Sequence, residues 1–156
     1  MGNTWSMDVR QYLPADREGC LTVFDSNMPD FFQSDERLEF EEFLNEPNGR
    51  YFVMELDSGI AGCGGYFVTE DKAVARLVWG MVHHDWQRKG LGRFLLLFRL
   101  REITKAGGVE LVCLDTPPLS THFFERQGFK VVRVAKDGYA PGLDRVEMLM
   151  KLTVCP

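Results

Sequence analysis

The chain has 156 residues, 45% of them hydrophobic and 26% charged, and a formal net charge of −5 at pH 7, and this length suits a single domain with a substantial core. The acidic balance argues against a general nucleic-acid binder, because such a protein needs a clustered cationic surface. The sequence contains no apolar run long enough to cross a bilayer and no signal-peptide core, so we expect a cytoplasmic protein whose partners include neither nucleic acid nor a membrane.

The first half of the chain predicts two helices and four strands. In chain order these are a strand at Val9–Leu13, a helix from Pro14 to Asn27, a helix from Ser34 that stops before Pro47, and strands at Tyr51–Leu56, Ile60–Val68 and Ala73–Val82. Residues 57–59 are a turn-prone connection of hairpin length, so the strands on either side should pair antiparallel. Ala73–Val82 is almost continuously apolar, as expected of a central strand covered on both faces.

The second half predicts two helices and three strands. They are a long helix from Gly90 to Ala106, a strand at Val109–Asp115, a shorter helix opened by Pro117 and closed by Gly128, and strands at Lys130–Val134 and Arg145–Leu152. The order of elements is mixed α/β, without an internal repeat.

The segment Gln87–Gly92, which follows the predicted central strand and leads into the long helix, carries the clearest chemical signal. The first turn of a helix has backbone N–H groups without partners, and the helix dipole places partial positive charge there. Gly90 and Gly92 leave room for a phosphate to approach the backbone. Arg88, Lys89, Arg93, Arg99 and Arg101 form a local basic patch in the same stretch. We therefore interpret this segment as a pyrophosphate site, although two glycines can also serve only a tight turn.

Two common nucleotide motifs are absent from the sequence. No Gly-Lys-Ser or Gly-Lys-Thr follows a first glycine as in a Walker loop, and the dinucleotide pattern Gly-x-Gly-x-x-Gly fails as well. The sequence therefore contains neither of the motifs that would indicate nucleoside triphosphate hydrolysis or NAD chemistry.

The chain resembles the GNAT superfamily of acyl-CoA N-acyltransferases, whose coenzyme signature is Gln or Arg, two residues, Gly, one residue, and Gly or Ala. Gln87, Gly90 and Gly92 match it, and Phe123–Phe129 is similar to the family's carboxyl-terminal segment. The resemblance covers residues 7–156 as one domain and leaves residues 1–6 as a terminal extension or cloning remnant. Within that extension Gly2 fits a myristoylation pattern, but the pattern fixes so few positions that chance explains it better.

The resemblance implies an α/β (α+β) fold: a mixed, twisted sheet of about seven strands with about four helices, and acetyl-CoA between splayed fourth and fifth strands. It also implies that the Gly80 N–H polarises the thioester carbonyl, which would stabilise the tetrahedral oxyanion of amine attack. The residues expected to contact the coenzyme are Gly80, Met81, Val82, Gln87, Arg88, Lys89, Gly90, Leu91, Gly92, Arg93, Thr116, Ser120, Phe123 and Phe124.

The acid and base are less well defined by the resemblance. Arg76 stands where some members carry a carboxylate base, and Phe124 stands where many carry a tyrosine that protonates the leaving thiolate. His83 has an imidazole suited to general base work, but a histidine beside an aspartate is also a common turn arrangement. Tyr139 is either a substitute acid or an aromatic residue at the rim of the pocket.

The expected function is that of an acetyl-CoA-dependent N-acetyltransferase that transfers the acetyl group directly to a primary amine of a small molecule, peptide or protein in a ternary complex. The alternative is a non-catalytic acyl-CoA-binding or regulatory module. No metal is expected, because the four cysteines, Cys20, Cys63, Cys113 and Cys155, are widely spaced. A homodimer through sheet edges is an open expectation for the last strand, which can equally be an internal one.

Overall fold

The structure is a computed structural model that describes residues 6–57 and 59–152. Its strands are β1 (Met7–Gln11), β2 (Arg50–Leu56), β3 (Gly59–Val68), β4 (Val74–Val82), β5 (Leu111–Thr116), β6 (Lys130–Ala140) and β7 (Leu143–Lys151). Its helices are α1 (Arg17–Ser26), α2 (Ser34–Asn45), α3 (Leu91–Ala106) and α4 (Thr121–Arg126), with short 3-10 helices η1 (Pro14–Asp16), η2 (His84–Trp86) and η3 (Pro118–Ser120). Residues 1–5 of the expected terminal extension, with Gly2, and Cys155 lie outside the described residues.

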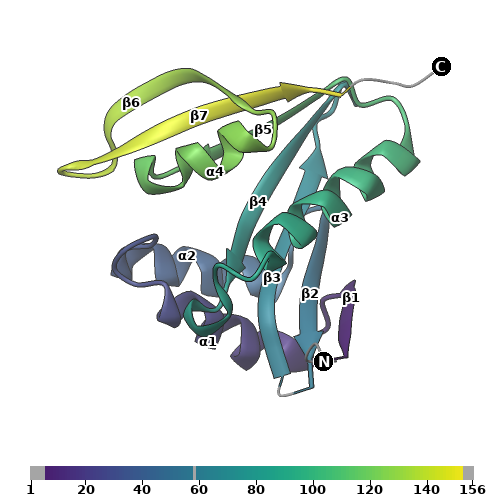
Figure 1. The fold of residues 1–156 in the computed structure, drawn as a ribbon, viewed down its shortest axis with the longest axis vertical. Helices are drawn as coiled ribbons and strands as arrows, with labels where there is room; N and C mark the ends of the chain where they lie inside the picture. The colour runs from purple at the N-terminus through teal and green to yellow at the C-terminus, as the bar shows by residue number, and fades with distance from the viewer. Residues whose placement is uncertain (1–5, 58, 153–156) are drawn as a thin grey trace. The chain divides into compact units, whose positions relative to one another are not determined.

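All seven strands belong to one sheet in the order β1-β2-β3-β4-β5-β7-β6, with β4 in the middle (Figure 1). β4 pairs with β5 in parallel, Val74–Arg76 against Leu111–Cys113. The pairs β1–β2, β2–β3, β5–β7 and β6–β7 are antiparallel. The mixed sheet, its central strand and the four helices predicted from the sequence are confirmed.

The chain folds as two compact units. The first contains Met1–Tyr66 and Val78–Leu100, and the second contains Phe67–Leu77 and Arg101–Pro156. Both β4 and α3 contribute residues to each unit.

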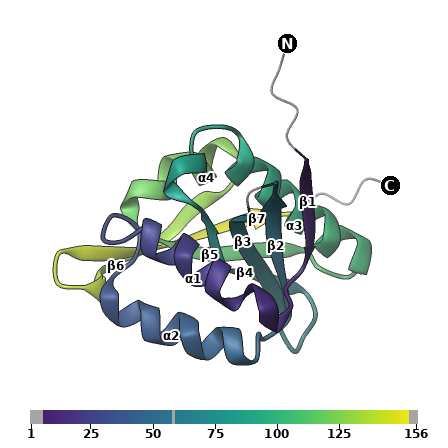
Figure 2. The same ribbon diagram turned by 90° about the horizontal axis from the view of Figure 1, so that it is seen from below.

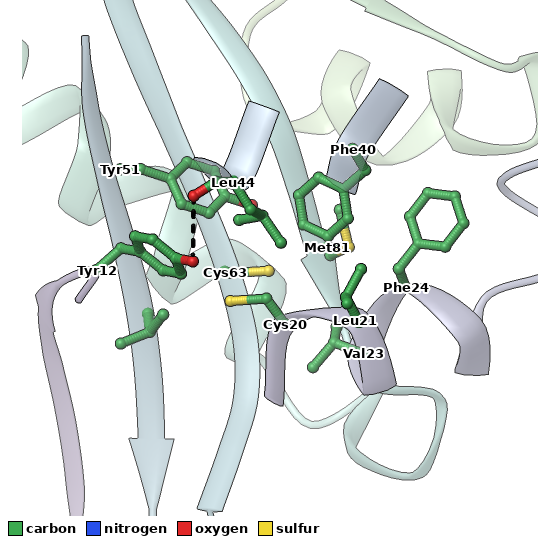
Figure 3. Close-up of a cluster of buried hydrophobic side chains, with 11 residues drawn as sticks. Tyr12, Cys20, Leu21, Val23, Phe24, Phe40, Leu44, Tyr51, Cys63 and Met81 are labelled. Carbon is green, nitrogen blue, oxygen red and sulfur yellow. Dashed lines mark hydrogen bonds between the residues drawn. The ribbon is translucent and has the colours of Figure 1, made fainter. Parts of the chain in front are cut away.

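In the first unit, α1 and α2 cover one face of the strands. They lie side by side in Figures 1 and 2, and Arg37 of α2 forms an ion pair with Asp25 of α1 at 2.7 Å. Figure 3 shows the core beneath them. Its buried residues are Tyr12, Cys20, Leu21, Val23, Phe24, Phe40, Leu44, Tyr51, Val53, Cys63 and Met81. These side chains hold the two helices on the sheet, because burial of apolar area is the main favourable term in folding.

The opposite face of the same strands is covered by α3. Leu91 and Leu95 of α3 pack with Met54, Ala61 and Val82 of the strands. Because both faces are covered, residues 51–54 of β2 are all buried, although a strand with one solvated face would alternate.

The second unit contains β5, β6, β7 and α4, and α4 lies beside the β6–β7 hairpin (Figure 1). The sequence predicted that the strand beginning at Lys130, which is β6, would end at Val134, so that Tyr139 would lie outside it. That boundary was wrong, since β6 continues to Ala140. Asp137, at φ 55°, accepts a hydrogen bond from the Gly142 N–H at 2.8 Å and thereby closes the β6–β7 hairpin.

Among the helices of residues 6–57 and 59–152, none combines the length and the apolar character needed to span a membrane.

Candidate functional site

The turn between β4 and α3 is held by two side-chain amides. Gln87 Nε2 donates to the Val82 carbonyl at 3.0 Å and to Asn27 Oδ1 at 2.6 Å. Asn27, at the end of α1, also donates to the Val82 carbonyl at 3.0 Å. The first motif residue therefore fixes the end of β4 against α1, and its side-chain amide is engaged with protein atoms.

The helix start has the geometry expected of an anion site. Gly90 has φ 83°, which favours glycine, and a Cβ placed there would meet nothing within 4 Å. The first α3 hydrogen bond runs from the Phe94 N–H to the Gly90 carbonyl at 3.0 Å, so the N–H groups of residues 91–93 precede the first intrahelical donor. The first turn contains no acidic residue. Arg88, Lys89 and Arg93 are exposed around it.

Lys89 has a second contact, because its Nζ lies 5.8 Å from the centroid of the Trp86 ring. Trp86 in turn packs against the apolar cluster under α3.

The segment of β4 before this turn contains Gly80, Met81 and Val82. Gly80 is exposed, whereas Met81 and Val82 are buried in the clusters on opposite faces of the sheet. Their side chains are thus committed to packing, and only their backbone groups could bind a coenzyme. Trp79, directly before Gly80, has φ 46°.

Arg99 lies beside Gly80. A Cβ at Gly80 would lie 2.8 Å from Nη2 and 2.9 Å from Nη1 of Arg99. The sequence interpretation placed Arg99 in a surface basic patch; this was wrong, since the residue is only 5% exposed. It lies on the buried face of α3, one turn after Leu95, and donates to the carbonyls of Leu95 and Gly65, both at 3.4 Å.

The charge of Arg99 is unusual for its environment. Burial lowers the pKa of its guanidinium to about 10, so it stays protonated at neutral pH. Among residues 6–57 and 59–152, no carboxylate forms an ion pair with it. A buried cation that has only carbonyl partners is costly, and here it stands next to an exposed backbone segment.

His83, the candidate base, caps η2. Its Nδ1 accepts a hydrogen bond from the Asp85 backbone N–H at 3.1 Å, and the backbone N–H of His83 donates to the Ala61 carbonyl at 2.7 Å. With Nδ1 as an acceptor, the neutral imidazole carries its proton on Nε2. In this arrangement neither ring nitrogen offers a free lone pair, so catalysis by His83 would require the cap to open.

In the second unit, Arg76 forms an ion pair with Asp115 of β5 and a hydrogen bond to Cys113 Sγ at 3.4 Å. Burial opposes the charge of Arg76, but the Asp115 carboxylate outweighs it and raises the Arg76 pKa. Asp115 Oδ1 is buried and has no hydrogen-bond partner among the described residues. A carboxylate is thus present on β5, the strand that pairs with β4, where the family resemblance led to the expectation of a carboxylate base.

The remaining predicted residues all lie in the second unit. Thr116 is buried and donates to the Pro117 carbonyl at 3.2 Å. Phe124 is half-buried, with its ring centroid 5.1 Å from that of Phe123 and 5.8 Å from that of Phe129. Ser120 precedes α4 without capping it through its side chain, and Tyr139 is half-buried in β6. The roles of these residues stay predictions.

Sequence reasoning missed Arg99, Asp115 and Tyr51 as components of a site. Arg99 lies four residues after Leu95, on the apolar face of α3. This position could have indicated that the arginine is buried. No comparable signal existed for Tyr51, whose contacts are with other elements of the chain, among them α2 and β4.

The central strand of the mixed sheet presents an exposed glycine, and a cationic turn and the start of a long helix follow it, an arrangement suited to an anionic ligand. The family model described as an acetyltransferase (GNAT) domain matches residues 47–131, more than half of the chain. The chain therefore belongs to the GNAT acetyltransferase family.

Individual relatives agree with this assignment. The amino-acid acetyltransferase of Vibrio vulnificus (strain CMCP6) is 29% identical over 110 residues, which cover 70% of this chain and 22% of that protein. The chain thus spans about a fifth of the length of the curated relatives that it matches. A crystal structure of a GNAT-family protein from Desulfovibrio desulfuricans has a TM-score of 0.82 at 24% identity, covering 95% of this chain and 100% of the other. An aminoglycoside 6′-N-acetyltransferase with bound coenzyme A has a TM-score of 0.77 at 13% identity, covering 96% and 99%.

Proposed function

We propose that this chain is an acetyl-CoA-dependent N-acetyltransferase that transfers the acetyl group directly to a primary amine within a ternary complex. The observation that carries the proposal is the start of α3, where Gly90 opens a helix without acidic residues in its first turn and Arg88, Lys89 and Arg93 surround it. Family membership supplies the coenzyme that this anion site would bind.

In the proposed reaction the amine nitrogen forms a bond to the thioester carbon, the C–S bond breaks, and coenzyme A leaves as a thiolate. An alkylammonium with a pKa near 10.4 must first lose a proton, which costs about 4 to 5 kcal/mol at neutral pH. The Gly80 N–H is the proposed donor to the oxyanion of the tetrahedral intermediate.

Two groups are candidates to receive the amine proton. His83 has a suitable imidazole but uses Nδ1 for capping. Asp115 keeps one carboxylate oxygen without a partner among the described residues. For the leaving thiolate, Tyr139 is the proposed acid, although a free thiol has a pKa near 8.5 and its anion can leave unassisted.

Coenzyme binding is tested by two matched variants, Gly90→Asp and Gly107→Asp, at the two ends of α3. The two glycines have φ 83° and φ 79°, and neither has an atom within 4 Å of an added Cβ. Each variant should lose about 1 to 2 kcal/mol of stability from its left-handed backbone. Acetyl-CoA at about a hundredfold excess over Kd should stabilise the wild type by about 2.7 kcal/mol. Gly107→Asp should keep this thermal shift and Gly90→Asp should lose it; an equal shift in both variants would place the anion site elsewhere.

Turnover is tested by measuring free thiol released from acetyl-CoA in the presence of free amino acids, short peptides, polyamines and aminoglycosides. Amine-dependent thiol release supports an enzyme. Binding of acetyl-CoA without release for any amine would favour the non-catalytic acyl-CoA-binding module.

A further inference from the structure

The backbone of β4 departs from regular strand geometry immediately before Gly80. Trp79 has φ 46°, in the left-handed region that residues with a side chain seldom occupy. A left-handed residue inside a strand changes the direction of the following peptide group, as it does in a β-bulge. Such conformations persist only where the surrounding structure holds them, and they are frequent at functional sites.

The indole of Trp79 is fixed by four phenylalanine rings. Its centroid lies 6.4 Å from that of Phe24, 6.0 Å from Phe32, 5.0 Å from Phe40 and 6.3 Å from Phe43. Three of these residues come from the helices that cover this face, Phe24 from α1 and Phe40 and Phe43 from α2. The Trp79 side chain is therefore anchored in the core, and a separate contact sets the direction of the Trp79 backbone carbonyl.

That carbonyl oxygen accepts a hydrogen bond of 2.8 Å from the phenol of Tyr51, on β2. Tyr51 is 2% exposed, and its ring is held edge-on by Tyr12, Phe40 and Phe43, with centroids at 5.9, 6.4 and 5.0 Å. Burial raises the pKa of Tyr51 well above its usual value, so the hydroxyl keeps its proton and remains a donor throughout the physiological pH range.

The Trp79 carbonyl and the Gly80 N–H belong to the same peptide group. Because this group is planar, fixing the direction of the C=O also fixes the direction of the N–H on its opposite side. A hydrogen bond accepted by the carbonyl also polarises the peptide and strengthens its N–H as a donor. On the Gly80 side, the guanidinium of Arg99 occupies the space where a side chain would stand, so the glycine is confined as well.

We propose that Tyr51 is a positioning residue for acetyl transfer: its hydroxyl holds and polarises the Trp79–Gly80 peptide group, whose N–H binds the thioester oxygen. This inference rests on the proposed function and adds a residue outside both family motifs. If the Tyr51 hydrogen bond were purely structural, its loss would lower the stability of the fold and leave kcat unchanged. A measurement of kcat therefore separates a structural role from a positioning role.

The chain contains a matched control, Tyr12. Its hydroxyl also donates to a buried backbone carbonyl, that of Leu44, at 3.3 Å, and its ring packs against Tyr51 in the same core (Figure 3). Tyr12→Phe and Tyr51→Phe thus remove the same chemical group from neighbouring buried positions. Only Tyr51→Phe releases the peptide before Gly80.

The experiment compares both variants with the wild type by acetyl-CoA affinity, by kcat for thiol release, and by the infrared carbonyl band of bound [1-13C]acetyl-CoA. Tyr51→Phe should lower kcat about tenfold, in line with the loss of one hydrogen bond, and its carbonyl band should move toward that of free acetyl-CoA. Its affinity should change by less than about threefold. Tyr12→Phe should leave kcat and the band unchanged.

If Tyr51→Phe does not fold, 3-fluorotyrosine at position 51 provides the second test. The fluorine makes the hydroxyl a stronger donor while preserving its shape, so the carbonyl band should move further from that of free acetyl-CoA. A folded variant with an unchanged kcat and band would overturn the role of Tyr51. Failure of the wild type to bind acetyl-CoA at all would instead overturn the proposed function.

Discussion

Replacing Gly80 with alanine should slow acetyl transfer while leaving the coenzyme bound. An added Cβ would lie 2.8 Å from Nη2 of Arg99, whereas non-bonded heavy atoms prefer about 3.5 to 4.0 Å, so the overlap is at least about 0.7 Å. Arg99 is 5% exposed and donates to two backbone carbonyls, so it cannot turn into solvent. The overlap is relieved by a shift of the Gly80 backbone or by a shift of the guanidinium that gives up these two contacts, and the first changes the direction of the Gly80 N–H.

The size of the effect follows from two magnitudes. Overpacking of a buried contact costs about 1 to 3 kcal/mol of unfolding free energy. Complete removal of an oxyanion donor lowers kcat by about 10² to 10³. A displaced N–H is weakened rather than removed, so we expect kcat to fall by about 10- to 100-fold. The acetyl-CoA affinity should change little, because the proposed phosphate site is at the start of α3, after the β4–α3 turn, whereas Gly80 lies before it.

The matched control is Gly19→Ala in α1, where an added Cβ would lie 2.7 Å from Cγ1 of Ile60. The overlap is of similar size, but it involves no residue of the proposed site. Urea unfolding should show a change in stability for each variant. Thiol release from acetyl-CoA, measured with an amine found active in the turnover test, should be slow only for Gly80→Ala. A folded Gly80→Ala protein with kcat within about twofold of wild type would refute the assignment of the Gly80 N–H as the oxyanion donor.

Three further outcomes are expected. His83→Ala should remove a cap worth about 0.5 to 2 kcal/mol and lower kcat by the same factor at pH 7 and pH 9; a greater loss at pH 7 would make His83 the base. Phe124→Tyr should raise kcat by less than about tenfold, and a loss of activity with intact acetyl-CoA binding would show that Phe124 shapes the acceptor pocket. Arg10 holds the pKa of Asp16 below its usual value, so Asp16 stabilises the fold above about pH 3.9 and this stabilisation is lost as pH falls through the lower folded-state pKa. Asp16→Asn should therefore cost about 1 to 3 kcal/mol at pH 7, and a urea midpoint difference that persists to pH 2 would argue against the ion pair.

Element types were predictable wherever hydrophobic periodicity was strong. The apolar run at Ala73–Val82 correctly predicted the central strand, observed as Val74–Val82, and the stripe of α3 predicted a helix that begins within one residue of the observed start. The end of β6 was misplaced because glycine and proline near Tyr139 are turn signals in any context, whereas the Asp137 hydrogen bonds that close the hairpin involve residues up to seven positions apart.

The sequence by itself predicted the proposed anion site, because the unpaired N–H groups at a helix start, the glycine at position 90 and the flanking cations all belong to one short contiguous segment. The tertiary structure decided everything that depends on where a side chain points across the sheet. Tyr51 reaches a carbonyl 28 positions away, and Arg99, one charge among several in its stretch of sequence, is buried beside Gly80. Strand register and helix rotation set these contacts, and both are fixed by the packing of the whole core rather than by any local pattern of residues.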